Sequence, residues 1–199
     1  MQFPRIAAGC CVDASAETIY SIGGCTEKQT ASKKCEVYSI EENKWSEWPD
    51  LPEALYSLSA CIFNDEYLFT VGGINAKGST VKTIQRLNLE DPHTTLWDTL
   101  DVKMGTPLSN VGLYQIKTNQ IIIFGGWAKG VKTAQVHILQ EQSNGTFSLR
   151  TKKNNTGDLK NADAFIINGV ARHDDGKKEI IFAGMDYIHK FHETSHVFD

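Results

Sequence analysis

The sequence lacks several features that would define a class of protein at once. No apolar run approaches the roughly 20 residues that a membrane-spanning helix needs. The opening residues MQFPRIAAGC contain no charged leader followed by a long apolar core. Positive charge is not in excess, because the formal net charge of the 199 residues is -4. The sequence therefore predicts a protein with no membrane partner and no nucleic-acid partner.

Cysteine is scarce, and its pattern argues against two further classes. The five cysteines lie in the first third of the chain, at Cys10, Cys11, Cys25, Cys35 and Cys61. An odd number makes a poor disulfide framework, and the absence of any C-x-x-C pair argues against a zinc ribbon. We expect reduced thiols and a cytoplasmic location.

Four apolar segments of similar composition recur along the chain. They read TIYSIGG, YLFTVGG, IIIFGG and EIIFAG, and they end at Gly24, Gly73, Gly126 and Gly184. Each run is apolar without alternation, which is the pattern of a strand that is buried on both faces. The small residues at the end of each run let the chain leave the strand with a positive φ angle. Such recurrence indicates a repeat protein.

Each of these segments has strand-like neighbours separated by polar turns. In the first unit IAAGCCV precedes TIYSIGG, and CEVYSI and WSEW follow it. In the third unit the last turn contains Asn144-Gly145, a strong hairpin signal. Four antiparallel strands per unit is the pattern of β-propeller blades. A single propeller region, 1–199, is predicted, with blades at approximately 5–48, 58–99, 110–150 and 164–199, the last of them incomplete.

The units resemble Kelch repeats, in which an apolar strand ends in Gly-Gly, a Tyr lies on the third strand and a Trp opens the fourth. The first unit matches this pattern at Gly23, Gly24, Tyr38 and Trp45. The second unit keeps Gly72, Gly73 and Trp97 but has Leu87 in place of the Tyr. The third keeps Gly125 and Gly126, with His137 or Val136 near the Tyr position and Phe147 in place of the Trp. The fourth has Ala183 before Gly184.

The resemblance implies an all-β, Kelch-type β-propeller with three complete four-stranded blades and a partial fourth. Because propellers of this family close with more blades, we expect a fragment or an incomplete arc. The remaining blades or another chain would then complete the ring. An ordinary β-sandwich with chance Gly-Gly pairs is the alternative fold.

The stretch HETSH at 192–196 matches H-E-x-x-H, the helical motif that binds zinc through two imidazoles. Here it follows the EIIFAG strand, in the position of a loop that leads into a third strand, where residues four apart do not share a face. We interpret His192, Glu193 and His196 as a chance match, with adventitious metal binding near His189 as the alternative. Two near-matches to a phosphate-binding loop, GINAKGST and GGWAKGVKT, lack the required Lys. The sequence thus predicts no catalytic residue, no metal and no cofactor.

Charge is distributed unevenly between the expected loops. In a four-stranded antiparallel blade, the loops after strands two and four emerge at one end, and those after strands one and three at the other. The loops after strand two contain one acid, Glu27. They also contain the lysines Lys28, Lys33, Lys34, Lys77, Lys82, Lys129 and Lys132. The opposite turns carry the acids Asp13, Glu17, Glu41, Glu42, Asp65, Glu66, Glu90, Asp91, Asp174 and Asp175. We expect a basic face that steers an acidic partner, with Trp127 as its aromatic anchor. The alternative is that these loops are simply polar.

These observations favour a protein-interaction scaffold or adaptor that uses its propeller loops to bind an acidic protein or peptide. The resemblance implies the same class of role. One alternative is a sugar-processing enzyme on a Kelch-like propeller, of the oxidase or isomerase type, which would need convergent Tyr, His, Arg or carboxylate groups around the central axis. Another alternative is a purely structural subunit of a large assembly.

Overall fold

The computed structural model describes residues 1–15, 17–28, 30–90, 96–133 and 135–151, together with the backbone of two strands at 167–174 and 178–184. Every regular element in these residues is a β-strand. In the same part of the chain, no helix has the length and apolar character needed to cross a membrane. Three antiparallel sheets have four strands each. The all-β prediction with repeated four-stranded sheets is therefore confirmed.

The four-stranded sheets follow one another along the chain and are named blades 1 to 3. Blade 1 contains β1 (Gly9–Val12), β2 (Thr18–Ile22), β3 (Cys35–Ser39) and β4 (Lys44–Trp48). Blade 2 contains β6 (Ser59–Phe63), β7 (Tyr67–Val71), β9 (Ile84–Asn88) and β10 (Asp98–Thr99). Blade 3 contains β11 (Gly112–Lys117), β12 (Gln120–Phe124), β15 (Val136–Glu141) and β16 (Phe147–Thr151).

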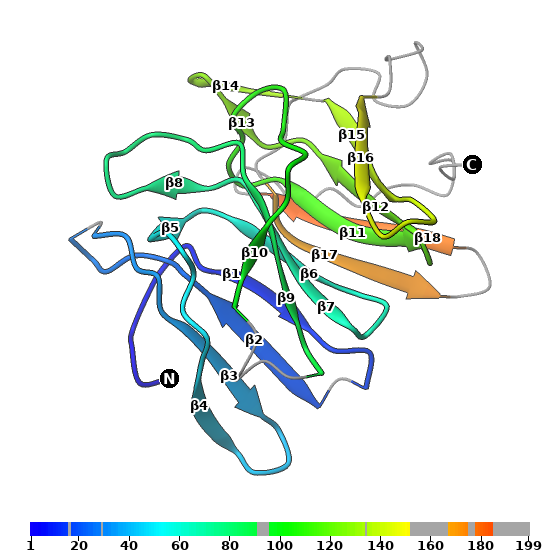
Figure 1. Cartoon of the computed structure of the whole chain (residues 1–199). Helices are drawn as coiled ribbons and strands as arrows, with labels where there is room; N and C mark the ends of the chain where they lie inside the picture. The colour runs from blue at the N-terminus through cyan, green and yellow to red at the C-terminus, as the bar shows by residue number, and fades with distance from the viewer. Residues whose placement is uncertain are drawn as a thin grey trace.

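Three two-stranded sheets complete the described structure. Blade 4 is represented by β17 (Ile167–Asp174) and β18 (Lys178–Gly184). Two short pairs lie between the blades: β5 (Leu55–Tyr56) with β8 (Ile74–Asn75), and β13 (Trp127–Ala128) with β14 (Val131–Lys132). The first strands of successive blades contact each other in the order β1, β6, β11 and β17. Figure 1 shows the sheets side by side in chain order, as the radial packing of a propeller requires.

Residues paired across neighbouring strands point to the same side of the sheet, so each blade has two faces. Both faces carry apolar side chains. We call the leading face the one that packs on the preceding blade, and the trailing face the one that packs on the following blade. On the trailing face of blade 1, Tyr20, Ile22 and Cys35 pack against Leu68 and Leu87 of the leading face of blade 2. The trailing face of blade 2 packs in the same way against blade 3. Burial on both sides explains why the central strands read as unbroken apolar runs.

The strand register corrects the position expected for the repeat tyrosine in the third unit. Tyr38 is opposite Ile19, and the equivalent pairs are Leu68 with Leu87 and Ile121 with Leu139. Leu87 therefore replaces the Tyr in blade 2, as predicted. In blade 3 the residue at this position is Leu139 rather than His137 or Val136, because strand pairing places Leu139, two residues after His137, opposite Ile121.

The tryptophan position in the third unit is corrected as well. Trp45 is opposite Tyr38, and the residue opposite Leu139 is Leu149. Phe147, the expected replacement, lies two residues earlier and pairs with Glu141. In blade 2, Trp97 is 8% exposed and its indole Nε1 donates to Pro49 O at 2.9 Å, so it does occupy the interface with blade 1.

The Gly-Gly turns lie at the junctions between blades. Gly23 and Gly24 have φ angles of 62° and 99°. Gly24 N donates to Leu55 O of the next linker at 2.8 Å, and Gly73 N donates to Leu108 O at 2.9 Å. A Cβ at Gly23 would lie 2.5 Å from Leu55 O, which is closer than side-chain carbons approach. The glycine pairs of blades 1 and 2 therefore let the following linker approach closely enough to hydrogen bond.

A second series of backbone hydrogen bonds joins the linkers that precede the first strands. Ala7, Ser57 and Asn110 occupy equivalent positions and have positive φ angles of 54°, 55° and 51°. Ser57 N donates to Ala7 O at 2.7 Å, and Asn110 N donates to Ser57 O at 2.8 Å. The linkers are thus bonded to each other from blade to blade beside the innermost strands.

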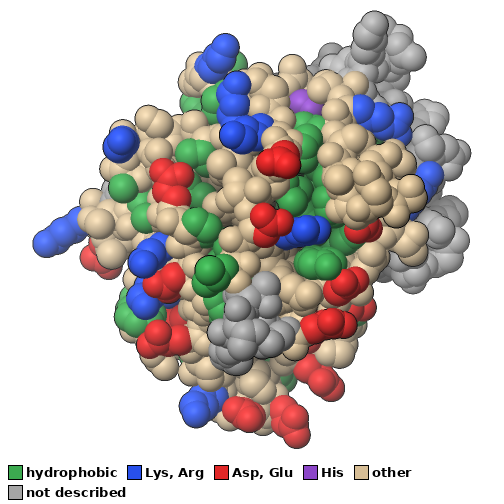
Figure 2. All heavy atoms as spheres, in the orientation of Figure 1, with side chains coloured by type: hydrophobic (Ala, Val, Ile, Leu, Met, Phe, Trp, Pro, Cys, Tyr) green, Lys and Arg blue, Asp and Glu red, His purple; other side chains and the backbone are tan. Residues whose placement is uncertain are grey.

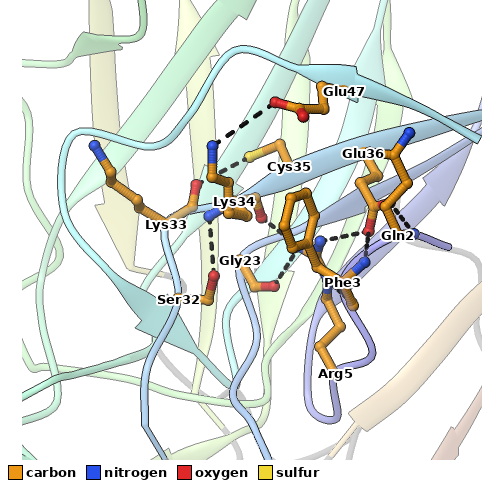
Figure 3. A network of polar contacts seen from close by, with 10 residues as sticks. All are labelled: Gln2, Phe3, Arg5, Gly23, Ser32, Lys33, Lys34, Cys35, Glu36 and Glu47. Atoms are coloured by element: carbon orange, nitrogen blue, oxygen red, sulfur yellow. Dashed lines mark hydrogen bonds and ion pairs between the residues drawn. The ribbon is translucent and has the colours of Figure 1, made fainter.

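A buried ion pair fixes the first linker to blade 1 (Figure 3). Arg5 Nη2 lies 2.5 Å from Glu36 Oε2, and the two side chains are 2% and 0% exposed. Arg5 Nη1 also donates to Gly23 O at 2.9 Å and to Lys34 O. The backbone N–H groups of Gln2 and Phe3 donate to the Glu36 carboxylate. Each charge is therefore compensated by its partner and by further hydrogen bonds, as buried charges must be.

The same two positions carry different residues in the other blades. Strand register places Gln85 and His137 at the position of Glu36, and both are buried. The linker positions of Leu55 and Leu108 correspond to that of Arg5, and both leucines are buried as well. The Arg–Glu pair of blade 1 is thus replaced by Leu–Gln in blade 2 and by Leu–His in blade 3.

The close approach at the Gly-Gly turn leads to a first prediction. Gly23→Ala adds both backbone strain and a clash with Leu55 O, whereas Gly78→Ala adds strain alone, because Gly78 has a φ of 74° and no atom within 4 Å of its added Cβ. We expect Gly78→Ala to lower the free energy of unfolding by about 1 kcal/mol, and Gly23→Ala by about 2 kcal/mol more. Urea unfolding of both variants measures the difference. Equal losses would show that the blade junction tolerates a side chain.

The buried pair leads to a second prediction. Arg5→Leu leaves the Glu36 charge buried without its partner and should lower the free energy of unfolding by about 3–5 kcal/mol. Adding Glu36→Gln creates the Leu–Gln combination that blade 2 already contains, so the double variant should be more stable than Arg5→Leu alone. Chemical denaturation of the two single variants and the double variant tests this coupling. A double variant that loses the sum of the two single losses contradicts it.

Candidate functional site

Linkers and Gly-Gly loops meet at one end of the molecule, which we call the Gly-Gly end. After each glycine pair the chain forms a short ladder with the linker before the same blade: Ile6 pairs with Cys25, Tyr56 with Ile74, and Ser109 with Trp127. The loop then returns to extend the ladder through Ala31, Thr80 and Lys132. In Figure 1 this end, marked by β5, β8, β13 and β14, faces the upper left. The loops after strand two are therefore held by hydrogen bonds rather than free.

Apolar side chains lie among these ladders, and sequence reasoning found only one of them. Trp127 is partly exposed, and its strand pairs with Lys132 across the β13–β14 hairpin. Tyr56 and Ile74 are partly exposed at the equivalent ladder of blade 2, and Ile6 is 56% exposed at that of blade 1. Only their position in the repeat could have identified them in the sequence. Ile74 and Trp127 directly follow a glycine pair, and Ile6 and Tyr56 lie three residues before the first strand of a blade. The site is therefore aromatic and aliphatic near the linkers.

Two of the seven predicted lysines are paired with acids. Lys33 Nζ lies 3.5 Å from Asp50 Oδ2, and Lys34 Nζ lies 3.4 Å from the same atom. Lys34 is also 3.8 Å from Glu47 Oε2 and stacks over the Phe3 ring at 5.6 Å. These are exposed ion pairs of low energetic value. They do, however, reduce the positive potential that Lys33 and Lys34 offer to a partner.

The other lysines are presented by ordered turns. Lys77 follows Asn75, whose Oδ1 accepts from the N–H groups of Lys77 and Ser79. Lys129 has a φ of 49° and with Gly130 forms the tight turn between β13 and β14. Lys82 Nζ donates to Gly105 O at 2.9 Å. Lys28 and Lys132 are exposed as well. Within the described residues, no ion pair within 4 Å involves Lys28, Lys77 or Lys129.

Acidic residues also lie at the Gly-Gly end. The sequence prediction missed them because it counted charges only in the loops after strand two. Asp50, Glu53 and Asp101 belong to the linkers after strand four, and those linkers emerge at the same end. Glu53 Oε1 accepts from Asn75 Nδ2 at 3.0 Å. Figure 2 accordingly shows Lys and Arg along the upper left of the molecule with some Asp and Glu among them. The end is basic at particular turns rather than uniformly.

The opposite end carries the acids that the sequence placed in the hairpin turns. Asp13 Oδ1 accepts from Glu17 N and Thr18 N. Burial alone would raise the pKa of the Asp13 carboxyl, but the hydrogen bonds together outweigh it and hold the pKa below the usual value. Glu41 and Glu42 are exposed in the turn between β3 and β4. Figure 2 shows acidic side chains gathered at the lower end of the view. Asp91 and Asp175 lie outside the described residues.

Nucleophilic and metal-binding chemistry finds little support among the described residues. Burial raises the pKa of the Cys35 thiol to about 12 and raises the pKa values of Cys11 and Cys61 as well, so these thiols stay protonated. No group of three or more His, Cys, Asp or Glu residues that could hold a metal ion occurs in this part of the chain. HETSH at 192–196 and the neighbouring His189 lie outside the described residues, so the interpretation as a chance match stays a prediction.

His137 is the buried polar residue of the leading face of blade 3. Its exposed fraction is 3%, and burial lowers its pKa below the usual value. Nδ1 lies 3.0 Å from Thr151 Oγ1, and Nε2 is buried and has no hydrogen-bond partner among the described residues. The imidazole is therefore neutral near pH 7 and belongs to the core rather than to a site open to solvent.

Comparison with known proteins points to one repeat family. A family model described as the Kelch motif matches residues 7–52, which contain all of blade 1. The Kelch repeat and BTB domain-containing protein 2 of cowpox virus (strain GRI-90 / Grishak) is 30% identical over 94 residues, 47% of this chain and 14% of that protein. Kelch-like protein 36 of Mus musculus is 47% identical over 45 residues, 22% of this chain and 7% of that protein. The matches thus span only a small part of these relatives.

A solved structure has the same arrangement of sheets. The chain is similar to the structure of YjhT with a TM-score of 0.67 and 14% sequence identity. The similarity covers 90% of this chain and 58% of that one. At this level of identity the likeness concerns the fold, and it agrees with the radial order of the blades.

The neutral state of His137 leads to a third prediction. Because its pKa is lower in the folded chain than in the unfolded chain, where it is about 6.5, the unfolded state takes up the proton first as the pH falls. The free energy of unfolding should therefore decrease from pH 7.5 to pH 5.5, by at most about 1.4 kcal/mol per pH unit from this residue. His137→Gln, which places the residue of blade 2 in blade 3, should weaken this dependence. Urea unfolding of both proteins at the two pH values provides the test, and parallel losses would contradict it.

Proposed function

The chain is a Kelch-repeat protein of β-propeller fold, and from this premise we propose that it is a protein-interaction scaffold or adaptor whose Gly-Gly end binds an acidic protein or peptide. The observation that carries the proposal is the combination of exposed, unpaired lysines with partly exposed apolar side chains at that end. Lys77 and Lys129 project from ordered turns of neighbouring blades, and Tyr56, Ile74 and Trp127 lie on the ladders from which these turns extend.

Different side chains of the Gly-Gly end would supply affinity and selectivity. Aromatic and aliphatic side chains that become buried on binding supply most of the affinity of an interface. Lysines at its edge attract an acidic partner and exclude a basic one. Because the turns are ordered before binding, little conformational entropy is lost when a partner docks. A cytoplasmic location and the absence of enzymatic activity belong to this proposal and stay predictions.

The names of the relatives support a role in protein interactions more than an enzymatic one. Both are described as Kelch proteins, and the viral protein also as BTB domain-containing. No described observation favours the alternative of a sugar-processing enzyme. The alternative of a structural subunit differs in one measurable respect, because it does not require the lysines of the Gly-Gly end.

Binding of a defined probe tests the proposal. The probe is a fluorescein-labelled peptide with several Glu residues around one Leu, and its matched control has each Glu replaced by Gln. We expect Lys77→Glu and Lys129→Glu each to weaken binding of the Glu peptide by about tenfold, as a change of ~1.4 kcal/mol produces. Trp127→Ala should also weaken it. Raising the salt concentration from 50 to 300 mM should reduce the affinity of the natural chain.

Two control variants separate a local effect from a general effect of net charge. Lys44→Glu changes an exposed lysine at the opposite end by the same charge. Lys33→Glu changes a lysine that already pairs with Asp50. Both should alter the dissociation constant by less than threefold. Equal effects of Lys44→Glu and Lys77→Glu, or equal affinities for the Glu and Gln peptides, would refute binding at the Gly-Gly end.

A further inference from the structure

Charge at the Gly-Gly end is divided unequally among the blades. Each blade contributes its loop after strand two and the linker that follows its fourth strand. For blade 1 these segments are residues 25–34 and 49–58, and their charged residues are Glu27, Lys28, Lys33, Lys34, Asp50 and Glu53. The three lysines and the three acids cancel, so this part of the end has no net charge.

Blades 2 and 3 carry the positive charge of this end. The segments of blade 2 are residues 74–83 and 100–111, and their charged residues are Lys77, Lys82, Asp101 and Lys103. The loop of blade 3 at 127–133 contains two lysines and no acid, so each of these blades adds a net charge of +2. Salt screens charges from one another over about 8 Å at physiological ionic strength. A docked partner therefore responds mainly to the charges of the blades that it contacts.

Ion pairing strengthens this difference between the blades. Asp50 pairs with both Lys33 and Lys34 of blade 1. Lys82 Nζ instead donates to the carbonyl oxygen of Gly105, which orients the side chain but leaves its charge uncompensated. Among the described residues, no ion pair within 4 Å involves Lys77, Lys82, Lys103 or Lys129. Lys103 is exposed, and sequence reasoning missed it because it lies in a linker after strand four.

The ladders of blades 2 and 3 adjoin each other. Ile74 directly follows Gly73, whose N–H donates to Leu108 O at 2.9 Å. Ser109, the next residue of that linker, exchanges two backbone hydrogen bonds with Trp127, at 2.8 and 3.1 Å. One short segment therefore holds Ile74 and Trp127 on neighbouring ladders, and both side chains are partly exposed. Figure 1 shows β8 and the β13–β14 hairpin at the same end of the molecule.

Val131 adds a further apolar side chain beside these lysines. A tight turn follows Ala128 and brings Val131 back to pair with it. Ala128 is 8% exposed, whereas Val131 is 63% exposed and lies between Lys129 and Lys132. Blade 1 also has an exposed apolar residue, Ile6, but no net charge accompanies it. We call the three apolar residues of blades 2 and 3 the apolar group: Ile74, Trp127 and Val131.

Lysine is the cation throughout this surface. Residues 74–83, 100–111 and 127–133 contain no arginine. A guanidinium fixes two parallel hydrogen bonds to a carboxylate, whereas a lysine ammonium is a compact charge on a flexible stem. This surface therefore selects the total charge of a partner rather than the exact spacing of its carboxylates.

We propose that the acidic partner of the Gly-Gly end binds across blades 2 and 3 and leaves blade 1 uncovered. The partner is an acidic segment of another protein with an apolar residue between its acids, because charge and apolar surface are complementary to it in these two blades only. Its apolar residue packs on the apolar group, and its acids lie beside Lys77, Lys103 and Lys129. The assignment rests on the proposed function, since it gives the same partner a place.

Two exposed lysines of the Gly-Gly end provide a matched pair for the first test. Lys103→Glu and Lys28→Glu change the net charge of the chain equally, and neither lysine has an ion-pair partner among the described residues. We expect Lys103→Glu to weaken binding of the fluorescein-labelled Glu peptide by about tenfold, and Lys28→Glu by less than about twofold. Equal effects would show that the whole end acts as one positive surface, and the assignment to blades 2 and 3 would be wrong.

The apolar contact is tested by a second matched pair. Val131→Ser and Ile6→Ser each remove an exposed aliphatic side chain, one in blade 3 and one beside blade 1. We expect Val131→Ser to weaken binding of the Glu peptide by about fivefold and Ile6→Ser by less than about twofold. The melting temperature of each variant shows whether it folds as the natural chain does. A larger loss of affinity in Ile6→Ser than in Val131→Ser would contradict the proposal.

Variation of the peptide tests recognition by total charge. Peptides in which the Glu residues are permuted around a fixed Leu should bind with dissociation constants within about twofold of each other. Replacing the Leu by Ser should weaken binding by about fivefold. A strong dependence on the order of the Glu residues would contradict recognition by flexible lysines.

Crosslinking locates the contact directly. Benzoylphenylalanine takes the place of the Leu in the Glu peptide, and mass spectrometry of the digested product identifies the linked segment. We expect links within 74–83, 100–111 or 127–133. Links within 25–34 or 49–58 would overturn the assignment while leaving binding at the Gly-Gly end intact. Equal affinities of the natural chain for the Glu and Gln peptides would instead refute the proposed function itself, so the two failures are distinguishable.

An anionic lipid surface is the other occupant that lysines beside exposed Trp and Val side chains would suit. Flotation with vesicles rich in phosphatidylserine separates this case from a protein partner. We expect the natural chain not to float with the vesicles. Flotation that is lost in both Lys103→Glu and Val131→Ser would show that a lipid surface occupies blades 2 and 3, and it would overturn the choice of partner.

Discussion

Packing of one blade against the next is the interaction on which the rest of this structure depends. A single four-stranded sheet with two apolar faces cannot bury both of them by itself. In blades 2 and 3 the neighbouring blades do so, and Leu68, Leu87 and Ile121 are excluded from water completely. Each such side chain contributes roughly 2 kcal/mol through burial. The Gly-Gly turns and the linkers between blades serve this packing, because they set how closely one sheet can follow another.

Much of this architecture was predictable because it follows from local patterns that recur. The unbroken apolar runs and the glycine pairs indicated four related units, and the structure shows these runs as β2, β7, β12 and β18. Register was harder to predict where a strand has no marker residue. The expected Tyr and Trp positions of the third unit, at His137 or Val136 and at Phe147, lie two or three residues before the residues that strand pairing places there. The correct ones, Leu139 and Leu149, are aliphatic and have no distinctive sequence signal.

Long-range electrostatic pairing was not visible in the sequence. Arg5 and Glu36 are 31 residues apart, and neither belongs to a motif that indicates a buried pair. Asp50 likewise pairs with both Lys33 and Lys34, and it belongs to a linker that the loop-based count of charges had left out. Strand direction alone decides at which end each loop emerges, so the end of each lysine-bearing loop could be read from the sequence. Which lysines stay unpaired depends on side-chain geometry that spacing cannot supply.

The three blades share one backbone plan but differ in chemistry at equivalent positions. Arg5 with Glu36, Leu55 with Gln85 and Leu108 with His137 are three solutions to the same buried position. At the Gly-Gly end, the residues directly after the glycine pairs are likewise different: Cys25, Ile74 and Trp127. These positions therefore hold a buried thiol, a partly exposed aliphatic side chain and a partly exposed indole in successive blades. Although the scaffold is repetitive, its surface is not, so the proposed partner would find one preferred orientation instead of several equivalent ones.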